Sequence, residues 1–162
     1  AVDWMINHSE KISYYFFQRN NNDKAVQWLI DHPEKTDCIY LSQNTKDKVV
    51  EWLIQRPEKI GYGSFSLNEN DKAVEWIINH PDKIDRCYFS RNSNDKAVDW
   101  LIKHPEKITE FFSANTNDKA VEWLLKHPDK INYDYFSGNT NTKIFIINNE
   151  NLLYIKKSLK FV

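Results

Sequence analysis

Apolar and polar positions along the chain repeat together every 24 residues, with one interval of 23. The copy that begins at Asn94 reads NDKAVDWLIKHPEKITEFFSAN: an apolar cluster around a Trp, a His-Pro step, then a second apolar group with a Phe. Units this short bury their apolar faces mainly against their neighbours. The pattern therefore predicts an all-α protein, an α-solenoid of about seven repeats, each with a short α-helix and a shorter α or 3₁₀ helix. The tryptophans that mark the copies are Trp4, Trp28, Trp52, Trp76, Trp100 and Trp123.

The first half of each unit carries the signals of a helix with defined ends. An Asn precedes the Asp-Lys pair in four copies and is expected to cap the helix start, with the acidic residue facing the positive end of the helix dipole. In the copy of Trp52, Lys46 takes this place, and Asp47 is the alternative cap. The His-Pro step predicts the helix end, because a residue before proline avoids the α region. The four capping residues are Asn22, Asn70, Asn94 and Asn117.

The apolar residues of the helix cover too wide an arc for packing on one side only, so each helix is expected to lie between neighbours. The Pro-Glu-Lys-Ile segment is expected to begin the second helical element, with Pro at its first position. Gly61 and Gly63 predict a less regular element in the third copy, and the missing residue between Ile108 and Phe112 predicts a tighter turn. The predicted core consists of the six tryptophans together with Phe65, Phe89, Phe112 and Phe136.

Two segments differ in how well they follow the repeat. Residues 1–141 hold the regular copies, whereas residues 142–162 are interpreted as a degenerate capping repeat, because Ile147 replaces Trp and no Pro follows. A terminal repeat needs one polar outer face. The chain opens at Ala1, within a copy, so we expect it to be a fragment of a longer array.

The unit W-[LI]-[LI]-x-H-P-[ED]-K-I-x(4)-F-S-x-N resembles short tandem repeats of giant DNA virus proteins from amoebae and algae. Its layout is also similar to that of leucine-rich repeat variant proteins. This resemblance implies a right-handed superhelix of alternating α and 3₁₀ helices and a viral origin. The richness in Asn, Lys, Ile and Tyr fits an AT-rich genome, as in many such viruses. Arg56 and Ser9, where other copies have His and Pro, depart from the pattern in single units.

Composition narrows the function classes. The 22 basic residues are balanced by 23 acidic ones along the whole chain, which disfavours a nucleic-acid partner. No apolar run is long enough to cross a membrane and no signal-peptide pattern is present. We therefore expect an intracellular protein, in the host cytoplasm or the virion if it is viral. Cys38 and Cys87 lie two units apart, too far for a disulfide, and are expected to be free thiols.

Three repeated residue types have both a chemical and a structural interpretation. The histidines of five copies could form a ladder of metal ligands, but stacked units hold them too far apart to share one ion, so we expect them to cap helix ends. The lysines of the first turn could bind anions, but an acidic residue three positions on favours salt bridges within the helix. The tryptophans could stack on bases, but their place in the apolar arc favours the core.

No arrangement of nucleophile and base, paired carboxylates or glycine-rich phosphate loop stands apart from the repeat. We therefore expect no enzyme, cofactor, metal or small-molecule substrate. The leading hypothesis is a non-catalytic scaffold that binds a protein partner; the alternatives are self-assembly as a structural part of a virion and an RNA-binding array. Variable positions of the second element are the candidate partner surface, unless they simply drift. They are Tyr14, Tyr15, Tyr40, Tyr62, Arg86, Tyr88, Glu110, Tyr133 and Tyr135.

Overall fold

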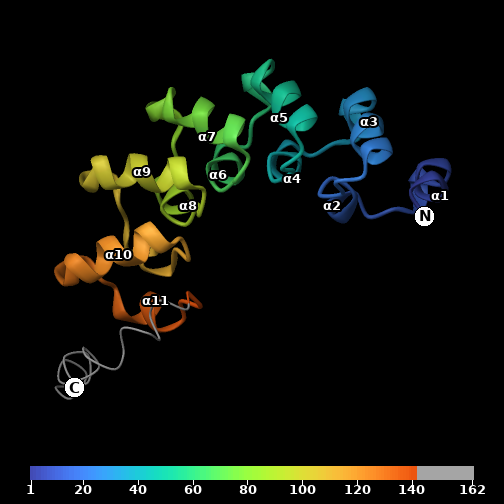
Figure 1. Cartoon of the computed structure of the whole chain (residues 1–162). Coiled ribbons are helices and arrows are strands. Elements are labelled where there is room, and N and C mark those ends of the chain that lie inside the picture. The colour runs from blue at the N-terminus through green and yellow to red at the C-terminus, as the bar shows by residue number, and fades with distance from the viewer. Residues whose placement is uncertain (142–162) are drawn as a thin grey trace.

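The computed structural model describes residues 1–141, in which all regular secondary structure is helical. The predicted capping repeat, 142–162, lies outside the described residues. Successive units line up along a curved row, with one longer helix of each unit on the outer side of the arc and one shorter element on the inner side (Figure 1). Helices of neighbouring units contact each other along the row, α3 with α5 and α5 with α7 for example.

Three kinds of element alternate along the chain. The outer helices are α1 (Val2–Asn7), α3 (Asp23–Asp31), α5 (Asp47–Ile54), α7 (Asp71–Ile78), α9 (Asp95–Lys103) and α10 (Asp118–Lys126). Single 3₁₀ turns follow them: η1 (Ser9–Lys11), η2 (Pro33–Lys35), η3 (Pro57–Lys59), η4 (Pro81–Lys83), η5 (Pro105–Lys107) and η7 (Pro128–Lys130). The inner elements are α2 (Tyr14–Phe17), α4 (Cys38–Leu41), α6 (Tyr62–Ser66), α8 (Arg86–Ser90), η6 (Glu110–Ala114) and α11 (Tyr133–Ser137).

The predicted caps of the outer helices are confirmed at all four asparagines. Asn94 Oδ1, for example, accepts a hydrogen bond of 2.8 Å from the backbone N–H of Lys96 at the start of α9. The same bond forms in α3, α7 and α10. The alternative cap in the copy of Trp52 is wrong, because Asp47 is already the first residue of α5 and Lys46 makes no side-chain cap.

The second half of a unit contains two elements where the sequence predicted one. After the 3₁₀ turn two residues are extended, such as Ile84 with φ −66° and ψ 119° and Asp85 with φ −78° and ψ 105°, and a new helix then starts. Asp85 caps this helix by accepting hydrogen bonds from the N–H groups of Cys87 and Tyr88. Asp37 and Asn132 also cap α4 and α11 through their side chains. The helices α2 and α6 start after the same extended pair without a side-chain cap, so the cap stabilises the new helix but is not needed to start it.

Two copies of the repeat are irregular in sequence. The third copy forms a regular short helix, α6, although we expected a less regular one; Gly61 lies outside it as the N-cap, and Gly63 has an ordinary negative φ. The shortened fifth copy forms η6, a 3₁₀ helix, where the full-length copies have an α-helix. A 3₁₀ helix turns more tightly than an α-helix, so the predicted tighter turn is confirmed.

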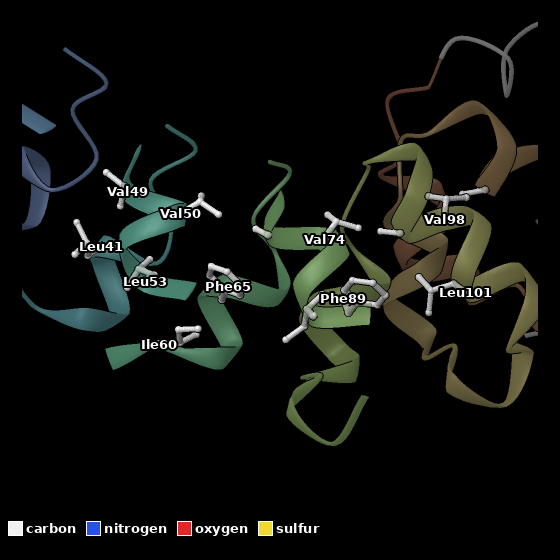
Figure 2. Packing of buried hydrophobic residues seen from close by; sticks show 14 of the residues in the cluster. Leu41, Val49, Val50, Leu53, Ile60, Phe65, Val74, Phe89, Val98 and Leu101 are labelled. Atoms are coloured by element: carbon white, nitrogen blue, oxygen red, sulfur yellow. The ribbon is translucent and has the colours of Figure 1, made fainter. Parts of the chain in front are cut away.

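The core is a continuous layer between outer helices and inner elements (Figure 2). In α9 its fully buried members are Ala97, Val98 and Leu101, and Phe89 of the preceding inner element packs with them. The predicted phenylalanines are all buried. The tryptophans are only partly buried against this layer, and Trp4, with 55% of its surface exposed, is not a core anchor.

Four of the tryptophans contact a buried phenylalanine eleven residues earlier in the chain. Phe89 contacts Trp100 edge-on, with ring centroids 5.7 Å apart, and Trp28, Trp76 and Trp123 have equivalent contacts. Before Trp52 the buried Leu41 takes the place of the phenylalanine.

Neighbouring units are joined by a ladder of buried asparagines, which we call the asparagine ladder. Asn92 donates both Nδ2 hydrogens to the preceding unit, to the carbonyl oxygens of Ser66 (2.9 Å) and Asn68 (3.0 Å). Its Oδ1 accepts from the N–H of Asn94 at 3.0 Å. One side chain thus satisfies three backbone groups in two units. The other members are Asn44, Asn68, Asn115 and Asn139.

In a second set of contacts, a side chain of one unit accepts a hydrogen bond from the backbone of the following unit. Ser66 Oγ accepts a hydrogen bond of 3.0 Å from the backbone N–H of Asp85, and Ser42, Ser90 and Ser113 do the same. In the first unit Gln18 replaces the serine, and its Oε1 accepts from Asp37 N–H at 2.7 Å. In both sets the later unit donates and the earlier unit accepts, so each junction has polar contacts of one direction as well as apolar contact.

Replacement of Asn92 tests the ladder. We expect Asn92→Ala to lower the free energy of unfolding by about 3 kcal/mol, since each buried polar group left without a partner costs about 1–3 kcal/mol. Asn92→Asp keeps the shape but places an oxygen against two carbonyl oxygens, so it should cost at least as much. Urea denaturation followed by circular dichroism would measure both. Asn79→Ala, at an exposed asparagine, is the control, and equal losses in Asn79→Ala and Asn92→Ala would contradict the role of the ladder.

Candidate interaction surface

The repeated histidines cap outer helices. His104 Nδ1 lies 2.8 Å from the carbonyl oxygen of Trp100, and because a carbonyl can only accept, the ring nitrogen is the donor. The imidazole also stacks on the Trp100 indole, with centroids 4.3 Å apart. His8, His32, His80 and His127 repeat both contacts. The expected capping role of the histidines is thus confirmed.

Arg56 fills the histidine position in the third unit and makes equivalent contacts. Its Nη1 donates to the carbonyl oxygen of Trp52 at 3.3 Å, and its guanidinium lies over the Trp52 ring, 4.7 Å from the centroid. A flat, cationic group on an indole face gains a cation–π attraction. The position therefore accepts a second planar donor, the guanidinium, in place of an imidazole.

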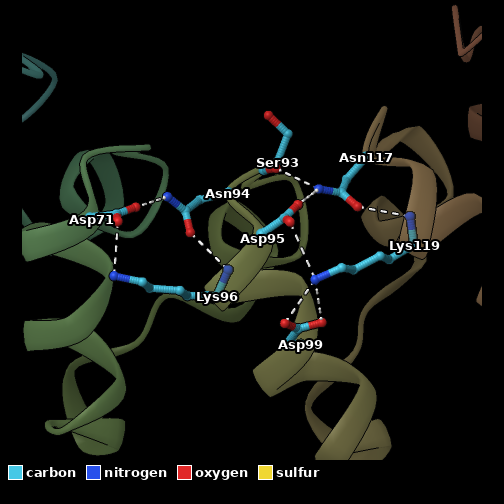
Figure 3. Close-up of polar contacts among 8 residues, drawn as sticks. All are labelled: Asp71, Ser93, Asn94, Asp95, Lys96, Asp99, Asn117 and Lys119. Carbon is cyan, nitrogen blue, oxygen red and sulfur yellow. Dashed lines mark hydrogen bonds and ion pairs between the residues drawn. The ribbon is translucent and has the colours of Figure 1, made fainter.

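The lysines of the first helical turn form ion pairs between units rather than within a helix. Lys119 Nζ lies 3.2 Å from Asp95 and 2.9 Å from Asp99, both on the preceding outer helix (Figure 3). Lys96 likewise reaches Asp71 at 2.8 Å and Glu75. The predicted pairs within one helix are wrong, because the acidic group of the previous unit lies closer along the row. We call these contacts the lysine ladder.

The lysine ladder shifts the pKa values of its members. Hydrogen bonds from Lys96 and Asn94 hold the pKa of Asp71 below its ordinary value, and those from Asn117 and Lys119 do the same for Asp95. Hydrogen bonds to Asp71 and Glu75 raise the pKa of Lys96. The charges of this outer surface are thus largely matched by each other, which leaves little excess charge for an anionic ligand.

The candidate partner residues all lie on inner elements. Tyr15, Tyr88, Tyr133 and Tyr135 are exposed aromatic residues, and Glu110 is exposed. The others are engaged in contacts within the protein, as follows. Tyr14 and Tyr62 stack on Trp28 and Trp76, Tyr40 meets Tyr15 edge-on at 4.7 Å between centroids, and Arg86 donates to the carbonyl oxygens of Glu106 and Lys107. The exposed members are therefore the ones available to a partner.

Further apolar side chains, which the sequence did not predict, lie on this surface. Phe16 is 70% exposed, Ile39 is 56% exposed, and the Phe111 ring lies 4.9 Å from that of Tyr135 in the next unit. The signal was present, since the residue before the buried core position is aromatic in most units. These residues are Phe16, Tyr40, Tyr88, Phe111 and Tyr135. We use the name inner surface for the exposed side chains of the inner elements.

Two depressions lie beside these side chains. One, of about 350 Å³, is lined by residues of the first unit that include Trp4, Met5 and Phe16. The other, of about 260 Å³, lies between α8 and η6 and is lined by Cys87, Tyr88, Arg91 and Phe111. Both Cys38 and Cys87 are free thiols, as predicted.

Within residues 1–141, no cluster of three or more His, Cys, Asp or Glu side chains has a geometry that could hold a metal ion. No helix in the same range is long and apolar enough to cross a bilayer. No protein-family model, curated protein or solved structure matches the chain.

Variants of His104 test what its position requires. We expect His104→Ala to lower the free energy of unfolding by about 1 kcal/mol, the usual contribution of a hydrogen bond, through loss of the helix-end contact. His104→Arg should stay within about 0.5 kcal/mol of the unmodified protein, since Arg56 makes both contacts in its own unit. Chemical denaturation would measure both. An arginine variant as unstable as the alanine variant would contradict the proposed equivalence.

Substitution of Lys96 tests the lysine ladder through pH. A lowered carboxylate pKa stabilises the fold above the ordinary value near 3.8, and this contribution is lost as pH falls through the lower folded value. The raised lysine pKa keeps its contribution in place below the ordinary value near 10.5. Lys96→Gln should therefore lower the thermal midpoint slightly at pH 7 and have a smaller effect at pH 2.

Lys103→Gln, at an exposed lysine of the same helix, is the matched control and should change the midpoint little at either pH. Thermal unfolding by circular dichroism at both pH values gives the comparison. A Lys96→Gln effect that is the same at pH 2 and pH 7 would show that the carboxylates do not supply it.

Proposed function

We propose that the protein is a non-catalytic α-solenoid scaffold that binds a protein partner along its inner surface. In this proposal the row of units is a right-handed superhelix of about seven repeats, with residues 142–162 as the capping repeat. The resemblance to viral tandem repeats supports a viral origin and a site of action in the host cytoplasm or the virion.

The observation that carries the binding role is the set of exposed aromatic and aliphatic side chains on four of the inner elements, α2, α4, α8 and α11. Tyr15, Phe16, Ile39, Tyr88 and Tyr135 are all substantially exposed. Large exposed apolar groups favour an interaction site, and tyrosine is a common energetic anchor at interfaces. The asparagine ladder and the core fix the spacing of these side chains. The scaffold would therefore lose little conformational freedom when it binds a partner.

The charge pattern supports a protein partner over RNA. Lys96 and Lys119 of the outer surface are paired with acidic groups of the preceding units. Nucleic-acid binding draws on unmatched positive charge, because phosphate neutralisation dominates its affinity. Filter binding of single-stranded RNA at low salt should accordingly show no retention.

Self-assembly is a second candidate, since exposed apolar side chains of the inner surface such as Phe16 and Tyr88 also suit contact with another copy of the chain. Light scattering after size exclusion separates the two candidates, since assembly requires a species larger than 19.4 kDa.

Affinity capture from cells in which the protein occurs tests the binding role. We expect one specific partner to be retained by the unmodified protein and to be reduced roughly tenfold or more by the triple variant Tyr15→Ser, Tyr88→Ser, Tyr135→Ser, since truncating even one anchor can cost over 1 kcal/mol. Quantitative mass spectrometry of the retained proteins gives the measurement.

The matched control replaces three exposed residues on the outer side, Gln55→Ser, Asn79→Ser and Lys103→Ser, which share one position of the repeat. This variant should retain the partner fully. Circular dichroism of both variants confirms that the fold is intact. If no protein is lost specifically with the inner-surface variant, the proposed function is wrong.

A further inference from the structure

We infer that the depression between α8 and η6 is a specificity pocket, which takes a large apolar side chain adjacent to a carboxylate on the protein partner. This inference rests on the proposed function and names one part of the partner's chemistry. Three independent features converge at this place: the shortened copy, the apolar lining of the depression, and an arginine without an internal partner.

The shortened copy changes the inner surface locally. Ile108 and Phe112 are one residue closer in sequence than Ile84 and Phe89, and the inner element becomes 3₁₀. Thr109 Oγ1, at the start of this element, is buried without a hydrogen-bond partner, whereas Asp85 at the equivalent position caps its helix. The tighter copy thus follows a different path from its neighbours.

Two aromatic rings line the depression without touching each other. Tyr15 and Tyr40 touch across one junction, and Phe111 and Tyr135 touch across another, each with centroids less than 5 Å apart. No ring contact joins Tyr88 to Phe111 within the described residues; instead these two side chains line the depression of about 260 Å³. Tyr88 is 46% exposed. The space between them can receive an apolar side chain of a partner.

A positive charge at the edge of the depression favours an acidic group next to the apolar side chain of the partner. Arg91 is exposed and lines the depression, and within residues 1–141 its guanidinium has no hydrogen bond or ion pair. Arg86, on the same helix, already donates to two backbone carbonyls. A free guanidinium binds a carboxylate through two parallel hydrogen bonds. Arg91 therefore complements an acidic group that flanks the apolar anchor.

Arg19 provides a matched comparison within the same chain. It occupies the same position of the repeat as Arg91, in the first unit, and is also exposed. The depression that it lines is bounded by polar residues such as Gln43, Thr45 and Glu69, in a copy of full length. An arginine therefore lines both depressions, but only the depression beside Arg91 has a mainly apolar lining.

A titration with small probes tests the pocket without any protein partner. N-acetyl-L-phenylalanine carries a ring beside a carboxylate, and N-acetyl-L-phenylalaninamide carries the same ring without the charge. We expect the acid to cause saturable shifts in the ¹H–¹⁵N spectrum at residues 87–91 and 110–112, with an affinity about threefold higher than the amide, the scale of an exposed ion pair. Arg91→Gln should remove this difference, and Arg19→Gln should leave it unchanged.

Insertion of one alanine between Thr109 and Glu110 restores the 24-residue interval and should abolish the localised shifts. Retained helical circular dichroism would show that this variant folds; Arg91→Gln tests the inference if it does not. Shifts that are absent, that spread over all inner elements, or that persist equally for acid and amide would overturn the pocket. None of these outcomes bears on whether the inner surface captures a partner, so the pocket and the scaffold function can fail separately.

Discussion

The asparagine ladder is the contact on which the rest of the structure depends. Each unit has too few apolar residues to form a core of its own, so it must join its neighbours in a fixed register. Asn92 sets that register, because its two N–H groups fit only two particular carbonyls of the unit before. A shift by one residue would leave both carbonyls and the Nδ2 group of Asn92 buried without partners, at a cost that apolar contacts alone would not impose.

The repeat, the all-helical class, the helix caps and the buried phenylalanines could be predicted from the sequence, since each depends on local pattern and composition. The split of the second half could not, because the residue at the break differs between copies: Asp85 caps the helix that follows, whereas Gly61 has no side chain to do so. The role of Asn92 was also missed: the recurring Ser-x-Asn was visible, but its carbonyl partners lie a full unit away. The acidic partner of Lys96 was misassigned for the same reason.

The candidate surface was partly visible in the sequence. Residues of the second element vary between copies while the rest of the unit is kept, and this variation predicted the candidate surface. Tyr88, one of these residues, is 46% exposed. Sequence variation could not show, however, that Arg86 is engaged with backbone carbonyls while Arg91 has no such contact. That distinction depends on the following unit, since the carbonyls that Arg86 binds belong to η5.

Every junction between described units has a direction, since a unit offers N–H donors from its asparagine to the unit before and carbonyl acceptors to the unit after. All of these junctions use the same types of donor and acceptor. Duplication or loss of a complete copy during replication would therefore rejoin compatible ends, whereas a break within a copy would not. The number of copies can change in whole units, and the length of the row with it, while every junction keeps the same contacts.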